Sequence, residues 1–193
     1  MNAAYINAAA PEPFKVLGKR LHHFTIGHQL LLERFDSGYA IASGKQPGYE
    51  DFVFSVWICS KTYSEALQSM GSICTPLWLR AWAWRCGNFD VIEAQSTFAK
   101  YIETHSQEPE WWKGKNWNDD NSGSDMSFGV FLKLRTQESL QLTEEQVMDF
   151  PFYEANLLHF RELQRHNVIE LITAEDRRMM KAAREIAGKV GMN

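Results

Sequence analysis

The most uniformly apolar stretch of the chain runs from residue 52 to residue 58, where only Ser55 interrupts the apolar side chains. A helix through these residues has no polar side, which is typical of a helix buried in a core. A fully buried strand would have the same composition over so few residues. We expect a helix at about residues 50–60, because the neighbouring segments have helical patterns and no hairpin turn adjoins this one. Glu50 and Asp51 would lie in its first turn, where the helix dipole favours negative charge.

Apolar residues at intervals of three and four predict a second helix, which begins after Thr25 and ends near Asp36. The hydroxyl of Thr25 suits an N-cap, since it can accept from a free backbone N–H of the first turn. The predicted core face comprises Phe24, His28, Leu31 and Phe35. The same reasoning predicts further helices at about residues 63–69, 76–86, 89–104, 144–150, 151–166 and 174–187. Thr143 and Gln146 form a capping box for one of them.

Residues 126–138 fit two kinds of secondary structure. Val130, Leu132 and Leu134 occupy alternate positions, as they would in a half-buried strand. No other strand is predicted with which this one could pair, so we expect a helix. The strand stays open as the alternative.

Residues 105–125 differ in composition from the rest of the chain, being polar and containing glycine, proline and several aspartates. Loops of this length are usually functional or disordered. A calcium loop aligned on Gly123 would have Gly129 where the bidentate glutamate belongs, so we expect no calcium site. Tryptophan in a polar loop either packs back on the body or anchors a partner. The candidate protein-binding residues are Trp111, Trp112 and Trp117.

These patterns predict an all-α fold, a compact multi-helix domain with one long Trp-rich polar loop. We expect a flexible N-terminal arm at residues 1–13 and a helical core at residues 14–104. The polar loop follows at residues 105–125, and residues 126–193 form C-terminal helices packed on the same core. A chain of 193 residues is long enough to bury such a core.

Charge and cysteine content narrow the classes of function. The net charge of −4 gives no electrostatic reason to expect nucleic acid as the partner. No apolar run reaches the length of a membrane span, and the N-terminus lacks a basic start followed by an apolar run. The three cysteines, Cys59, Cys74 and Cys86, are an odd number without a C-x-x-C motif. We therefore expect reduced, buried thiols in a cytoplasmic protein.

No catalytic, cofactor or metal motif emerges from the residues. The phosphate-loop, dinucleotide, nucleophile-elbow and zinc spacings are all missing. His22, His23 and His28 have no carboxylate or cysteine at the helical spacing that a metal site would need. We therefore predict no catalytic residues, no cofactor and no metal, and we expect these histidines to be core-edge or surface residues.

Two segments carry a resemblance to a known family. The first is Leu142-Thr-Glu-Glu-Gln-Val-Met-Asp-Phe-Pro-Phe-Tyr-Glu-Ala-Asn156, a capped short helix followed by an Asp-apolar-Pro step and a long helix. The second is Thr25-Ile-Gly-His-Gln-Leu-Leu-Leu32. Both resemble segments of small helical proteins of phage and prophage tail modules, namely tail-assembly chaperones and their neighbours. The long Trp loop is not part of that pattern.

The resemblance implies an all-helical, non-enzymatic protein in the cytoplasm of an infected or lysogenic cell. Such a protein would bind the tape-measure protein or tail subunits and keep apolar helices from aggregating. Our first hypothesis is thus a non-catalytic interaction protein, with tail assembly as its specific version. The alternatives are a nucleic-acid-binding regulator that uses the C-terminal helices, and a small enzyme with an unrecognised site.

Overall fold

The structure is a computed structural model that describes residues 13–70, 75–86, 89–117 and 126–190. The side chains of residues 75–79, 174 and 184–190 lie outside this description. The helices are α2 (Ile26–Arg34), α3 (Tyr49–Cys59), α4 (Tyr63–Met70), α5 (Thr75–Cys86), α6 (Val91–Ser106), α7 (Phe128–Leu140), α8 (Glu144–Met148), α9 (Phe152–Arg165) and α10 (Ala174–Val190). The strands are β1 (Lys15–Val16), β2 (Lys19–Arg20), β3 (Trp111–Lys113) and β4 (Ile169–Leu171).

The fold is helix-rich, as predicted, but it is not purely all-α. Two small antiparallel sheets accompany the helices, one of β1 with β2 and the other of β3 with β4. The first is a hairpin whose turn residues Leu17 and Gly18 both have positive φ angles. The second joins the predicted polar loop to the connection between α9 and α10. Strands of two and three residues are too short to leave an alternating pattern, and this is why the sequence did not predict them.

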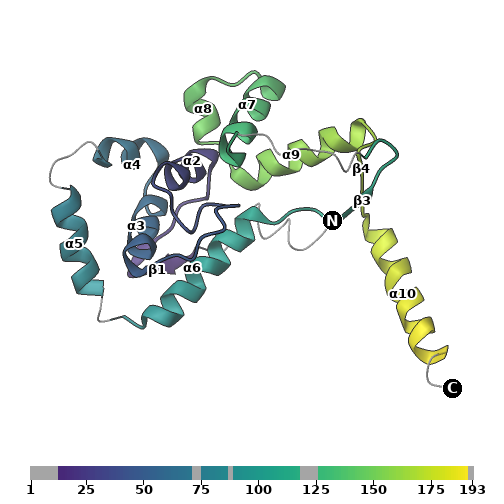
Figure 1. The fold of residues 1–193 in the computed structure, drawn as a ribbon, viewed down its shortest axis with the longest axis horizontal. Helices are drawn as coiled ribbons and strands as arrows, with labels where there is room; N and C mark the ends of the chain where they lie inside the picture. Colours follow the sequence, from purple (N-terminus) through teal and green to yellow (C-terminus); the bar gives the residue numbers. More distant parts are fainter. Residues whose placement is uncertain (1–12, 71–74, 87–88, 118–125, 191–193) are drawn as a thin grey trace.

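Helix α3 lies at the centre of the core, and the helix alternative for this stretch is confirmed. Phe52 and Val56 lie on one side of the helix and Ile58 points to another side, yet all three expose none of their surface. Burial on several sides requires neighbours on several sides. Figure 1 shows α2, α4, α5 and α6 grouped around this helix.

The N-terminus of α2 is fixed by the predicted cap. The Thr25 hydroxyl accepts a hydrogen bond from the His28 backbone N–H, and the His28 ring in turn accepts from the Thr25 N–H, so the pair forms a capping box. On either side of this cap, Ile26 N–H donates to the Phe150 carbonyl at 3.1 Å and Phe152 N–H donates to the Phe24 carbonyl at 3.0 Å. The start of α2 is therefore joined directly to the start of α9.

Glu33 fixes the position of α7. Its carboxylate accepts from the Ser127 hydroxyl at 2.7 Å, the Gly129 backbone N–H at 2.9 Å and the Gln29 amide at 2.9 Å. A Cβ atom at Gly129 would lie 2.8 Å from the Glu33 carboxylate, so a larger residue there would push this carboxylate away. The predicted helix is thus confirmed, although it begins at Phe128 with Ser127 as its N-cap rather than at Met126. The first turn of α7 takes its negative partner from α2.

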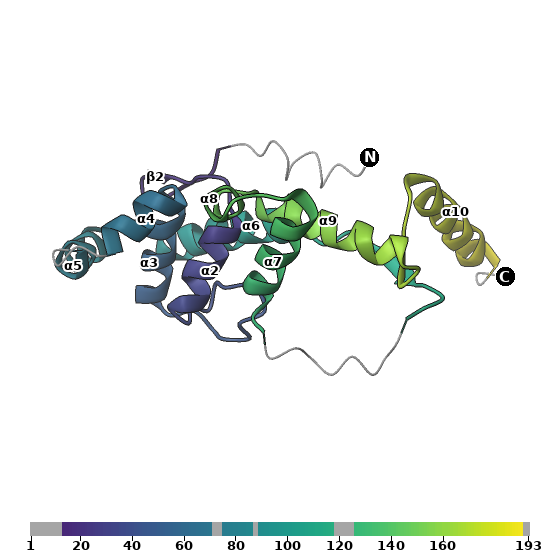
Figure 2. The same ribbon diagram turned by 90° about the horizontal axis from the view of Figure 1, so that it is seen from above.

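The C-terminal helices differ in how they meet the body. Helix α8 begins at the predicted capping box of Thr143 and Gln146, and α9 packs against α7. Helix α10 projects from the far end of the molecule, beyond β4 (Figures 1 and 2). It continues through Gly188, where the sequence predicted that it would end. The predicted N-terminal arm, except for Pro13, lies outside the described residues.

None of the helices in the described ranges is both long enough and apolar enough to cross a membrane.

Replacement of the α3 tryptophan tests whether this helix holds the core together. Trp57 is 2% exposed, and its ring stacks on Phe54 at 5.9 Å. We expect Trp57→Ala to lower the free energy of unfolding by about 3–5 kcal/mol, because it leaves a cavity at the centre of the core. Chemical denaturation measures the loss.

The matched control is Trp84→Ala, because Trp84 is 87% exposed. Its effect should stay within about 0.5 kcal/mol. Equal losses in the two variants would show that α3 is not the centre of the core.

Candidate protein-interaction site

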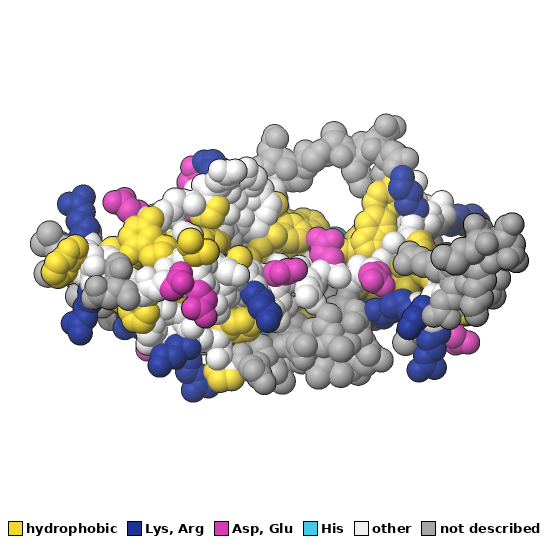
Figure 3. All heavy atoms as spheres, turned by 90° about the horizontal axis from the view of Figure 1, so that it is seen from below, with side chains coloured by type: hydrophobic (Ala, Val, Ile, Leu, Met, Phe, Trp, Pro, Cys, Tyr) yellow, Lys and Arg dark blue, Asp and Glu magenta, His cyan; other side chains and the backbone are white. Residues whose placement is uncertain are grey.

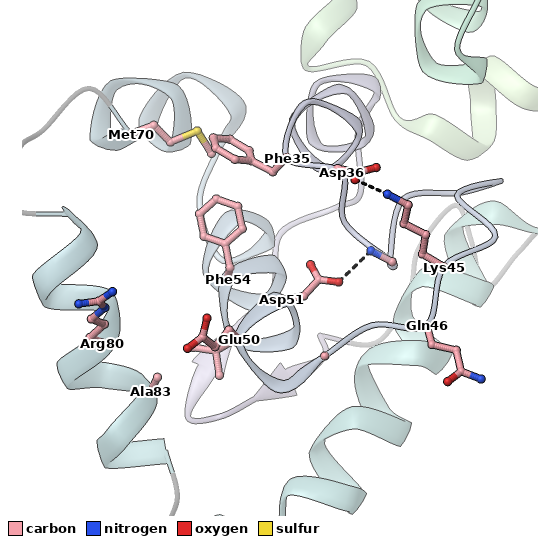
Figure 4. A pocket seen from close by; sticks show the side chains of 13 residues that line it. Phe35, Asp36, Lys45, Gln46, Glu50, Asp51, Phe54, Met70, Arg80 and Ala83 are labelled. Carbon is pink, nitrogen blue, oxygen red and sulfur yellow. Dashed lines mark hydrogen bonds and ion pairs between the residues drawn. The ribbon is translucent and has the colours of Figure 1, made fainter.

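A pocket of about 630 Å³ opens beside α3, between the end of α2 and helix α5 (Figure 4). It lies where the cover over α3 is incomplete, since Phe54 is only partly buried. We name it the Phe35–Phe54 pocket. Its apolar lining is formed by Phe35, Val53, Phe54, Met70 and Ala83, and its polar lining includes Asp36, Lys45, Gln46, Glu50, Asp51 and Arg80.

Two aromatic rings form the apolar centre of the pocket. Phe35 and Phe54 meet edge to face with their centroids 4.8 Å apart, and Figure 4 shows Met70 directed at the Phe35 ring. Phe35 is 45% exposed, although the sequence placed it on the core face of α2. That prediction was wrong: Phe35 is the C-cap of α2, where its ring contacts the partly buried Phe54 in the open pocket instead of the closed core. Large exposed rings in a concave surface are typical of binding sites.

Charges of both signs surround these rings. Asp36 and Lys45 form an ion pair, while the Asp51 carboxylate accepts from the Gly38 N–H at 2.8 Å and thereby fixes the loop before α3. Glu50 and Arg80 form no ion pair within the described part of the chain. The pocket can therefore offer one free acid and one free base to a ligand. An apolar centre with a polar rim is the usual form of a protein-binding surface.

The three predicted tryptophans lie together on the β3–β4 ribbon and its turn, far from the pocket (Figure 1). The rings of Trp111 and Trp117 stack on each other at 4.9 Å, and the Lys113 ammonium lies 5.4 Å from the Trp117 ring centre. Trp112 is 43% exposed, opposite Glu170 on the partner strand. Neighbouring residues of a strand face opposite sides. Trp111 and Trp112 therefore cannot belong to one flat surface.

The ribbon closes the end of α9. Gly114 N–H donates to the Val168 carbonyl and Asn116 N–H to the Asn167 carbonyl, both at 2.8 Å. A Cβ at Gly114 would lie 2.4 Å from the Asn167 oxygen, so the close approach depends on glycine. The stacking of Trp111 on Trp117 occupies one face of each ring, whereas Trp112 is 43% exposed and is the tryptophan most open to a partner.

The three histidines considered as metal ligands do not converge. His22 is exposed, and His23 meets the ring of His105 edge to face at 4.9 Å. His28 is buried, and both of its ring nitrogens are occupied. Nε2 donates to the Lys61 carbonyl at 2.8 Å, because a carbonyl can only accept, and Nδ1 accepts from the Thr25 N–H at 3.2 Å. Within the described ranges, no three His, Cys, Asp or Glu side chains are grouped so that they could hold a metal ion.

Burial shifts the pKa values of two histidines and two cysteines. It lowers the pKa of His28 from 6.5 to about 4, and it lowers the pKa of His105 to about 4 as well. Burial raises the pKa of the Cys59 thiol far above its ordinary value, and it also raises the pKa of Cys86. Both cysteines are free and protonated at neutral pH, so neither is an activated nucleophile. Cys74 lies outside the described residues.

The chain matches no protein-family model, no curated protein and no solved structure.

The sequence did not predict the Phe35–Phe54 pocket, whose lining comes from three separate stretches of the chain: residues 35–54, Met70, and residues 80–83. One signal pointed to it. A helix that is apolar all round needs cover on every side, and the segment just before α3 is a loop containing Gly38, Gly44, Pro47 and Gly48. A loop rich in glycine offers few side chains for that cover.

The buried histidines should make the protein sensitive to mild acid. Their folded-state pKa values lie below the value of 6.5 expected in the unfolded chain, so the unfolded chain takes up protons first as the pH falls. Stability is therefore complete above about pH 6.5 and is lost toward pH 4. We expect about 2–3 kcal/mol from each histidine over this range. Urea denaturation at a series of pH values measures the loss.

Two variants test whether the buried histidines cause the loss of stability in acid. His105→Gln removes one buried ring and should flatten the pH dependence, whereas His166→Gln removes an exposed ring and should not. The same slope in all three proteins would show that the buried rings do not cause the acid sensitivity. Carboxylates whose pKa is lowered, such as Glu65 and Glu144, contribute only at more acidic pH.

Proposed function

We propose that this chain is a non-catalytic interaction protein that binds an apolar helix of a partner protein in the Phe35–Phe54 pocket. The observation that carries the proposal is the pair of rings, Phe35 and Phe54, which form an apolar centre open to solvent beside the buried helix α3. A partner helix laid over these rings would complete the cover of α3.

The shape and chemistry of the pocket support a helix as the ligand. Its volume of about 630 Å³ accommodates several side chains but not a folded domain. An amphipathic helix presents apolar anchors at intervals of three and four residues, with charged residues on either side. The anchors would meet Phe35 and Phe54, and the flanking charges would meet Glu50 and Arg80.

The specific version of the proposal is tail assembly in a phage or prophage. The two segments that resemble tail-module proteins form α2 with its cap and the α8–α9 region, which are joined through backbone hydrogen bonds. In this version the partner is the tape-measure protein or a tail subunit, met in the cytoplasm of the infected or lysogenic cell. The pocket would shield an apolar helix of that partner before assembly.

The alternatives receive less support from the geometry. A DNA-reading helix exposes polar residues near its N-terminus, whereas Phe152 and Tyr153 at the start of α9 are buried. An enzyme that used His28 as a base would need a free ring nitrogen, and both of its nitrogens are engaged with the backbone.

Affinity capture from the native host tests the proposal. Wild-type protein should recover a tape-measure protein or tail subunits, identified by mass spectrometry. Phe35→Ser should reduce that recovery about 30-fold or more, because a buried aromatic anchor contributes on the order of 2 kcal/mol to binding.

Phe89→Ser is the control for a general loss of surface hydrophobicity. Phe89 is 47% exposed, nearly the same as Phe35, but it lies outside the pocket. Thermal unfolding verifies that both variants fold. Equal recovery by Phe35→Ser and wild type, or equal loss in both variants, contradicts the proposed site, and recovery of nucleic acid alone contradicts the proposed function.

A further inference from the structure

A second groove lies on the body between α4 and α8, away from the Phe35–Phe54 pocket. It has a volume of about 480 Å³ and an apolar floor formed by Tyr63, Leu67 and Met148. Leu67 is 39% exposed, so the floor is open to solvent. Both helices approach Gly27 of α2 closely. A Cβ there would lie 2.5 Å from the Tyr63 ring and 2.8 Å from the Met148 carbonyl oxygen.

The charged residues that line this groove all carry the same sign. Glu144, Glu145 and Asp149 come from α8 and its C-cap, and the other polar lining residues, Ser64 and Gln68, are uncharged. Lys133 neutralises Glu144 through an ion pair at 2.6 Å. Glu145 and Asp149 form no ion pair within the described ranges. The groove therefore suits an apolar ligand that carries positive charge.

Helix α10 has the complementary chemistry. Among its described side chains, Met179 is 60% exposed and Ala183 is also exposed, on the same side of the helix. Arg178 is exposed at the border of this side, about 100° around the helix from Met179, whereas Glu175 and Asp176 lie on the same side as Met179 in the first turn, next to the base of the helix. The helix has five basic and three acidic residues, whereas the whole chain has 20 and 24. The predicted apolar stripe also includes Ile186 and Val190, whose side chains lie outside the description.

Among the residues whose side chains are described, helix α10 packs little against the rest of the molecule. Its base is tied to the ribbon by an ion pair between Arg177 and Glu110 at 3.6 Å, and beyond this it projects away from the body (Figures 1 and 2). Lys and Arg side chains lie at this end of the molecule and also at the opposite end (Figure 3). A helix of 17 residues is only marginally stable in water without tertiary contacts. Burial of its exposed apolar side on another surface would therefore stabilise the helix.

The groove of the same copy is out of reach. Helix α10 follows α9 through the short strand β4 at one end of the molecule, and α4 lies at the other end (Figure 1). Every copy carries both α10 and the α4–α8 groove. A second copy can therefore offer its groove to α10 of the first copy.

We propose that α10 of one copy docks into the α4–α8 groove of another copy. Met179 and Ala183 lie against Tyr63, Leu67 and Met148, where the flexible methionine side chains adapt to each other. Arg178 meets Glu145 and Asp149 at the rim. The contact is head to tail, so copies join into a ring or an open chain. This self-association does not depend on what binds in the Phe35–Phe54 pocket.

Two charge-changing variants test the contact on the full-length chain. Met179→Glu places an acid at the centre of the docking side of α10 and leaves the groove intact. Glu145→Lys places a base on the rim of the groove and leaves α10 intact. Sedimentation velocity at low salt should show assemblies for the wild type that dissociate as the salt concentration rises. Each variant alone should be monomeric, with association weakened at least tenfold.

Mixing the two variants gives the sharpest result. An intact groove from Met179→Glu and an intact α10 from Glu145→Lys can form one contact only, so an equimolar mixture should contain 1:1 dimers and nothing larger. Lys181→Glu is the matched control, since Lys181 is exposed on the opposite side of α10. This variant should assemble like the wild type.

Other outcomes overturn the proposal. Assembly that persists in Glu145→Lys and in a second groove variant, Leu67→Glu, but is lost in Met179→Glu would show that α10 pairs with α10. A mixture that stays monomeric, or a wild type that is monomeric up to several hundred micromolar, would show that α10 does not bind the groove of a second copy. Circular dichroism verifies that each variant is folded.

Discussion

Helix α3 buries apolar side chains on several sides, and the positions of its neighbours follow from the cover that it needs. A helix with one apolar side can rest on a single surface, whereas this one requires several. The cover is complete over Phe52, Val56 and Ile58 and incomplete over Phe54. The Phe35–Phe54 pocket is the gap that remains, and this links the proposed binding function to the same constraint that organises the core.

Polar groups determine how the covering helices are oriented. Glu33 joins α2 to the start of α7, and His28 joins the start of α2 to the turn after α3. The His28 ring can do this only while it is neutral, because Nδ1 must accept a hydrogen bond from Thr25 while Nε2 donates one to Lys61. Burying such groups is favourable when every donor and acceptor has a partner. The hydrogen bonds of Glu33 and His28 therefore hold the helices of the core in place at neutral pH. Those of His28 require the neutral ring, so the stability of the core depends on pH.

The sequence predicted the features that depend on local chemistry. The helical character of α3 and α7 and the caps at Thr25 and Thr143 could be inferred from residues close together in the chain. The β3–β4 ribbon could not, because Trp111 pairs with Leu171, which is sixty residues further along. Phe35 was misplaced because a spacing rule gives the face of a helix but not how far the closed core extends along that face.

The candidate site was predictable only in part. Trp111, Trp112 and Trp117 were selected because tryptophan in a polar loop is unusual, and two of them stack on each other within the ribbon. The pocket and the α4–α8 groove both combine segments that are distant in the sequence. Their lining residues are ordinary core and surface types, so only the folded structure brings them together.

Site-specific photo-crosslinking at position 35 tests whether the gap over α3 binds a partner protein. A photoreactive phenylalanine analogue would replace Phe35 in the protein expressed in its host, with the same analogue at position 89 as the reference. We expect a light-dependent adduct from position 35 to an apolar helical segment of one partner protein, and no such adduct from position 89. The absence of an adduct from position 35, or equal adducts from both positions, would contradict the claim that the gap over α3 is a binding site.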